Sequence, residues 1–249
     1  MDRDEWMRRL GPLFPAAVAI RRTTAARLPR ALDVAAEDLP RSAPWMVGLG
    51  VVTGFLGYTA AWLVAHWGGS PLLAAAFAIA VLALCGGAVV ESGFARWAEA
   101  RAGRGAMIAS VAALLVRFAA LASIAPGHWL AALVIAEVAA RWSALLLQRL
   151  GDPILDDALR PGLSVGEVSW GAVGAVTLAV AIAAAWGFGG RGVATLLACG
   201  VAAFALGLEA QRRDGQPTSD ALAAAASVGA AIALVAIALI VPGLPAWNP

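Results

Sequence analysis

Seven long apolar runs, separated by polar segments, dominate the chain from residue 45 onward. Most of them reach the roughly 20 apolar residues that a helix needs to cross the hydrocarbon core of a bilayer. The run at 193–208 is the shortest, and whether it spans the bilayer fully is left open. The pattern predicts an all-α, polytopic membrane protein with about seven transmembrane helices, at Trp45–His66, Pro71–Val90, Ala106–Ala125, His128–Gln148, Val168–Phe188, Val193–Leu208 and Ala221–Val241.

The first 44 residues have a different pattern, with many arginines and one short apolar patch at Leu13–Ile20. That patch is too short to cross a bilayer, so we expect an interfacial helix whose neighbouring arginines meet anionic head groups. Pro40 and Pro44 are expected to close the segment, because proline disfavours a continuing helix. The predicted organisation is an N-terminal interfacial or cytoplasmic segment at 1–44 and a transmembrane helical domain at 45–249.

Composition supports the membrane assignment: 61% of the 249 residues are hydrophobic and 14% are charged. A soluble chain of this length needs more polar residues to cover its surface. The net charge of +2 is too small to indicate a nucleic-acid partner, and membrane lipid is the expected surrounding. Fifteen of the 18 basic residues, all arginine, lie in the N-terminal segment and in alternate loops, which predicts that these face the cytoplasm.

Three charged residues lie inside apolar runs, where an isolated charge is unfavourable by a few kcal/mol or more. Glu137 and Arg141 are four positions apart, in the favourable acid-before-base order on one helix. We expect them to form an internal ion pair, with Arg117 from a neighbouring helix able to join it. The alternative is that Arg141 points toward the loops and holds a phosphate. Taken alone, the same charges would also fit the path of a small transporter.

The polar stretch GGAVVESGFARWAEARAGRG at residues 86–105 is predicted to be a cytoplasmic loop. Carboxylates and arginines of this kind can bind a diphosphate through a magnesium ion. The last loop ends in Thr218, Ser219 and Asp220, any of which could cap the final helix. Asp152, Asp156 and Asp157 in the third loop are more typical of turn residues than of ligands. No serine-hydrolase elbow, HExxH, P-loop or GxGxxG motif is present.

Several segments together resemble the cobalamin synthase family, the adenosylcobinamide-GDP ribazoletransferases. Arg141 also falls where that family has an arginine in mid-helix, and Thr218 and Asp220 match its GGxTGDxLGA stretch. The resemblance spans nearly the whole chain in the family's order, through ARLP at 26–29, RSAPWMVGLGVVTG at 41–54, GAVVESGFARWAEA at 87–100, ALRPGLS at 158–164 and GQPTSDALAAA at 215–225.

The chain departs from the family in its acidic loop, whose pattern is roughly GGxHxDGxADxxDG. Glu91, Gly93 and Ala95 are retained from the commoner variants of that pattern. An arginine in place of a metal-ligand aspartate puts a fixed cation where the metal would lie, which reverses the local electrostatics. The replacements are Val90 for the histidine and Ser92, Arg96 and Glu99 for the three aspartates.

The resemblance implies a bacterial inner-membrane protein whose functional face is cytoplasmic. The family reaction joins cobinamide-GDP to α-ribazole or its 5′-phosphate with release of GMP, in a magnesium-assisted attack on a phosphoryl group. Carried over to this chain, the roles are Arg141 and Asp220 as catalytic residues, Thr218, Gly215 and Arg96 as substrate-binding residues, and Glu91 and Glu99 as ligands of a reduced magnesium site.

Three functions stay open at this stage. The losses in the acidic motif favour a non-catalytic or strongly divergent member that serves as a binding or scaffold subunit without a metal. The alternatives are an active, Mg²⁺-dependent transferase and a small transporter. A corrinoid or nucleotide ligand, a protein partner and a homo-oligomer all remain compatible with the sequence.

Overall fold

The computed structural model describes residues 3–24, 35–86, 88–151 and 162–241, which fold into helices with no strand among them. The predicted all-α fold is therefore confirmed. The predicted interfacial patch forms part of α2. The helices are α1 (Arg3–Leu10), α2 (Phe14–Thr23), α3 (Leu39–His66), α4 (Pro71–Cys85), α5 (Val89–Ala102), α6 (Ala106–Ala122), α7 (Trp129–Leu150), α8 (Trp170–Asp214) and α9 (Ser219–Ile240).

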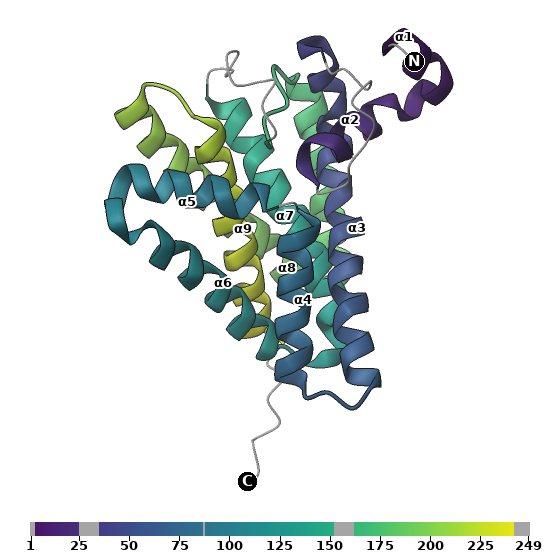
Figure 1. The fold of residues 1–249 in the computed structure, drawn as a ribbon, viewed down its shortest axis with the longest axis vertical. Helices are drawn as coiled ribbons and strands as arrows, with labels where there is room; N and C mark the ends of the chain where they lie inside the picture. The colour runs from purple at the N-terminus through teal and green to yellow at the C-terminus, as the bar shows by residue number, and fades with distance from the viewer. Residues whose placement is uncertain (1–2, 25–34, 87, 152–161, 242–249) are drawn as a thin grey trace.

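Helix α7 forms the centre of the bundle and packs against α3, α8 and α9 (Figure 1). Its side chains are buried on nearly every face, and Leu133, Ala139 and Leu145 are fully shielded. A helix that is apolar all round is expected in such a central place. Since α7 also carries Glu137 and Arg141, these charges lie in the middle of the protein.

Two glycines bring α3 close to α7. A Cβ atom on Gly50 would lie 2.8 Å from the carbonyl carbon of Glu137, and one on Gly54 would lie 2.6 Å from the Cα of Val134. Gly50 and Gly54 have a GxxxG spacing, which can occur by chance in so glycine-rich a chain. Here the two glycines lie at the contact between the two helices.

Replacing Gly54 with alanine is expected to lower the free energy of unfolding by about 1–3 kcal/mol, because the new methyl group would meet backbone atoms that cannot move aside. Gly48→Ala is the matched control, since a Cβ there meets nothing within 4 Å. That variant should be neutral or slightly more stable, because alanine favours helix. Thermal unfolding in detergent measures both, and equal melting temperatures would contradict the close contact.

Helix α8 is two helical arms joined by a sharp reversal. Phe188 and Gly189 depart from helical geometry, with φ of −140° and 62°. Just after the break, Gly192 lies against the carbonyl oxygen of Ala184, which an uninterrupted helix would hold about 12 Å away. The predicted runs Val168–Phe188 and Val193–Leu208 correspond to these two arms.

By length and composition, α3, α7 with its short leading turn, α8 counted as one helix across its break, and α9 are candidates to cross a membrane. Helices α4 and α5 make a fifth candidate only if the sharply bent pair is one span, and α6 is shorter than a span. The described residues thus contain four or five candidate spans. They support a multi-pass membrane protein, and the predicted count of seven is not confirmed.

Two local expectations were wrong. The stretch expected to be a loop contains helix α5, which lies across the other helices in Figure 1. The polar residues of this stretch indicate an exposed surface and are compatible with a loop. Its alanines, glutamates and arginines, however, are good helix formers. Pro44 lies inside α3, which continues past it, and Pro40 lies in the first turn, where a missing N–H breaks no helical hydrogen bond.

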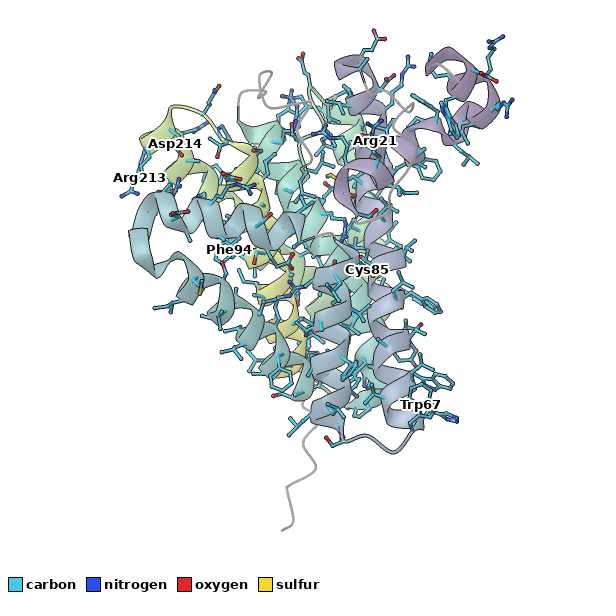
Figure 2. All side chains as sticks on the ribbon, in the orientation of Figure 1. Arg21, Trp67, Cys85, Phe94, Arg213 and Asp214 are labelled. Carbon is cyan, nitrogen blue, oxygen red and sulfur yellow. The ribbon has the colours of Figure 1, made fainter. Side chains whose placement is uncertain are left out.

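The charged side chains gather at one end of the bundle. Figure 2 shows Arg21, Arg213 and Asp214 near that end and Trp67 at the tight turn of the other end. Trp67 is 80% exposed and Trp186, near the reversal of α8, is 93% exposed. Exposed tryptophans at the helix ends fit a membrane–water interface there. The polar end is therefore the place to look for a site.

Candidate functional site

A buried charge network is centred on Glu137 of α7. Its Oε2 lies 2.7 Å from Nη1 of Arg141 and its Oε1 lies 2.8 Å from Nη2 of Arg117 on α6. The hydroxyl of Thr53 on α3 donates a hydrogen bond to Oε2 at 3.3 Å. All four side chains are buried. The internal ion pair predicted from the sequence is present, and Arg117 joins it.

Glu91, predicted as a magnesium ligand, extends this network. It lies in the first turn of α5, and its Oε1 is 3.3 Å from Nη1 of Arg117. The network then holds two glutamates and two arginines with no net charge. Pairing of this kind is how charged side chains are tolerated among apolar helices.

A cavity of about 20 Å³ borders Glu91, Arg117, Glu137 and Arg141. That volume holds about one water molecule. The space that this cavity offers beside the network is therefore too small for a larger solute.

Arg96 and Asp220, which are 124 positions apart, meet where α5 packs on α9. The Nη2 and Nε atoms of Arg96 lie 2.8 Å and 3.0 Å from Oδ1 of Asp220. Gly93 lets the two helices touch, because a Cβ there would collide with Ala223. The arginine is 57% exposed and the aspartate 30%, so the pair lies at the surface of the protein. Arg96, where the resemblance implies an aspartate in the family, thus binds Asp220.

Thr218 and Gly215, predicted to bind substrate, shape the turn between α8 and α9. The Thr218 hydroxyl accepts a hydrogen bond from the amide of Ala221 at 3.2 Å and caps α9. Gly215 ends α8 with φ of 75°, a left-handed conformation that glycine adopts without strain. Both residues have local roles that position Asp220.

Arg101 was not singled out by the sequence, yet it anchors the far end of α5 to α8. Its Nε donates to both carboxylate oxygens of Glu209 at 2.9 Å, and its Nη2 lies 3.0 Å from Asp214. The guanidinium also stacks over Trp97 at 4.4 Å from the ring centre. The carboxylates hold the pKa of Arg101 above its usual value although burial opposes them. Its partners are 108 and 113 positions away, so no local pattern announces them.

The acidic residues present do not fit a magnesium ion in this arrangement. Asp220 is bound by Arg96 and Glu91 by Arg117. Glu99 is exposed on α5, eight positions from Glu91, which is about 12 Å along a helix and too far to share one ion. Within the described ranges, no three His, Cys, Asp or Glu side chains come together as a metal site. Asp152, Asp156, Asp157 and the ARLP stretch at 26–29 lie outside the described residues.

The comparisons with known proteins bear on this fold and site. Residues 97–238 match the family CobS, described as cobalamin-5-phosphate synthase. The match covers more than half of the chain, takes in α6 to α9, and begins directly after Arg96. No curated protein and no solved structure matches the chain. On the strength of this match and of the segments that resemble it, the chain belongs to the cobalamin-5-phosphate synthase family.

Proposed function

We propose that this protein is a non-catalytic member of its family, a membrane subunit that keeps the helical scaffold and has lost magnesium-dependent transfer. The observation that carries the proposal is the contact between Arg96 and Asp220, at 2.8 Å and 3.0 Å. A guanidinium bound to the retained aspartate satisfies the carboxylate that a metal ion would need.

Electrostatics supports this reading. A magnesium ion is held by one or two carboxylates together with phosphate oxygens and water. Two of the three candidate carboxylates, those of Glu91 and Asp220, already face arginines, and Glu99 has no ion-pair partner among the described side chains. A divalent cation brought to Asp220 would have to displace Arg96 or lie beside a like charge, which is unfavourable in either case.

The polar end of the bundle is the proposed functional face. The clustering of arginines there favours a cytoplasmic orientation in a bacterial inner membrane. Arginine side chains on that face suit an anionic ligand such as a nucleotide or a nucleotide-linked corrinoid, held without a metal. A protein partner that uses the same face is the other form that a scaffold role can take.

The test is a transfer assay with the purified protein, cobinamide-GDP, α-ribazole and Mg²⁺, with a family member that has the full acidic motif run alongside. We expect no release of GMP above background from this protein, while the control enzyme turns over. GMP release that Glu99→Gln abolishes, and that Ser92→Ala leaves unchanged, would instead identify an active enzyme that uses Glu99. Both substituted residues are exposed on α5.

A further inference from the structure

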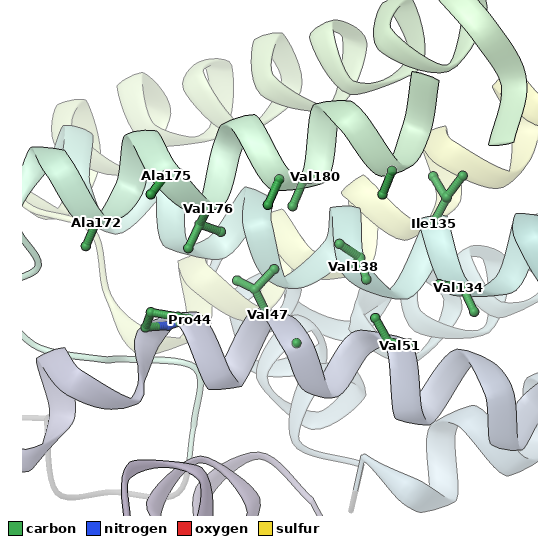
Figure 3. A pocket seen from close by; sticks show the side chains of 13 residues that line it. Pro44, Val47, Val51, Val134, Ile135, Val138, Ala172, Ala175, Val176 and Val180 are labelled. Atoms are coloured by element: carbon green, nitrogen blue, oxygen red, sulfur yellow. The ribbon is translucent and has the colours of Figure 1, made fainter. Parts of the chain in front are cut away.

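An apolar groove runs along one side of the bundle, away from the charge network. Helix α3 and the first arm of α8 form its walls, and α7 forms its floor (Figure 3). Helix α3 and helix α8 each pack on α7 and make few contacts with each other, which leaves the groove between them. The groove has a volume of about 430 Å³, and its lining consists of apolar side chains, glycine and proline, among them Gly48, Val51, Val138 and Ala179.

The dimensions of the groove suit a thin hydrocarbon chain. Along α8 it extends from Ala172 to Ala183, about 16 Å of helix, which is close to the roughly 15 Å depth of one bilayer leaflet. That length accommodates one extended acyl chain of a single leaflet.

Two arginines flank the end of the groove nearest the polar face. Arg149 lies on the same side of α7 as Val138, three turns further on, and its guanidinium stacks over Trp170 at 4.1 Å from the ring centre. Its Nε is buried and has no hydrogen-bond partner in the described part of the chain. Arg41 is exposed on α3, one turn before Pro44, which lines the groove.

The segment that precedes α8 is hydrogen-bonded to Gln148, the residue next to Arg149. Gln148 accepts a hydrogen bond from the amide of Val165 at 3.0 Å and donates one to the carbonyl of Gly166. The exposed carboxylate of Glu167 lies in this loop, and it forms no ion pair with Arg149 in the described structure. Among the described residues, Arg149 thus has no carboxylate partner and retains hydrogen-bonding capacity.

We propose that the groove is a binding site for an anionic glycerophospholipid of the surrounding membrane. One acyl chain lies between α3 and α8 on the floor of α7. The phosphate of the head group lies at the polar end, within reach of Arg149 and Arg41, where a basic side chain attracts anionic lipid. This site is independent of whether the protein has catalytic activity.

The experiment is native mass spectrometry of the full chain in detergent, titrated with phosphatidylglycerol or with phosphatidylcholine of the same acyl chains. We expect the wild-type protein to keep one phosphatidylglycerol molecule in preference to phosphatidylcholine. Gly48→Leu fills the groove without a Cβ clash and should lower that occupancy at least fivefold. Gly174→Leu is the matched control, because it too meets open space but lies outside the groove, and it should stay within twofold of wild type.

A second pair of variants tests the head group and guards against misfolding. Arg149→Gln should reduce the preference for phosphatidylglycerol about fivefold, while Arg212→Gln on the exposed end of α8 should not. Ala179→Leu fills the groove from the opposite wall and replaces Gly48→Leu if that variant does not fold. Equal lipid loss in Gly48→Leu and Gly174→Leu, no lipid preference in the wild type, or a dimer that Gly48→Leu dissociates would each overturn the proposal.

Discussion

Replacing Glu137 with alanine is expected to lower the free energy of unfolding by about 3–5 kcal/mol, because it breaks a buried ion pair by removing one partner. The carboxylate of Glu137 lies within 2.8 Å of both Arg117 and Arg141. Without it, two buried guanidiniums face each other, and Glu91 at 3.3 Å from Arg117 can balance only one of them. Thermal or dodecyl-sulfate-induced unfolding in detergent micelles measures the loss.

Glu99→Ala is the matched control for this substitution. It removes the same carboxylate from an exposed position and should change the free energy of unfolding by no more than about 0.5 kcal/mol. The combined variant Arg117→Met, Glu137→Leu and Arg141→Met should recover part of the stability lost in Glu137→Ala, because apolar side chains of similar volume need no partners. Glu91 loses Arg117 as its partner in this variant, but its side chain is partly exposed to water.

These variants also separate the two roles considered for Arg141. A structural ion pair requires both the loss in Glu137→Ala and the recovery in the triple variant. If Glu137→Ala is as stable as wild type, Arg141 is not committed to Glu137, and phosphate binding becomes the better account of it. A triple variant as unstable as Glu137→Ala would mean that the network does more than balance charge.

Replacing Arg96 with aspartate is expected to make the stability of the protein depend on magnesium. The new carboxylate would face Asp220, whose Oδ1 lies 2.8 Å from the present guanidinium, and the two like charges should destabilise the protein in the absence of metal. Added Mg²⁺ should then raise the free energy of unfolding by about 2.7 kcal/mol once its concentration reaches 100 times the dissociation constant. Melting temperatures with Mg²⁺ and with a chelator provide the measurement.

Arg96→Ala is the control, because it removes the guanidinium without adding a ligand. Neither it nor the wild type should respond to Mg²⁺ by more than a fraction of the shift seen in Arg96→Asp. A wild-type protein stabilised to the same extent would mean that a metal binds despite the arginine, and the proposed loss of catalysis would lose its basis. An unresponsive Arg96→Asp variant would mean that Asp220 is not placed to share an ion.

Helix α5 was not predicted from the sequence. The charges of residues 86–105 indicated an exposed surface, and Arg96 and Glu99 are exposed, but they did not indicate whether the backbone there is loop or helix. The helix begins after Ala88, a non-glycine residue with φ of 54°, and ends at Gly103, also with φ of 54°. Its position depends on Gly93 against α9 and on Arg101 against α8, contacts that no local pattern contains.

The resemblance to the cobalamin synthase family was recoverable from ordered segments of the chain, and the family match bears it out. The losses in the acidic motif stay a prediction from that resemblance, because most of the motif lies before the matched residues 97–238. The contact that Arg96 makes could not be predicted, since its partner Asp220 lies 124 positions away and could as well have been free to bind a metal.

The sequence by itself determined that the chain consists largely of apolar helices and belongs in a membrane, and it favoured pairing of Glu137 with Arg141 within one helix. Those features depend on the transfer of side chains between water and lipid and on the spacing of neighbours in a single helix, both of which are local. Only the tertiary structure decided which carboxylate each arginine meets, because Glu91 and Asp220 reach Arg117 and Arg96 through the packing of α5 on α6 and α9. Partner choice between distant helices depends on how their surfaces fit, and no single segment encodes that fit.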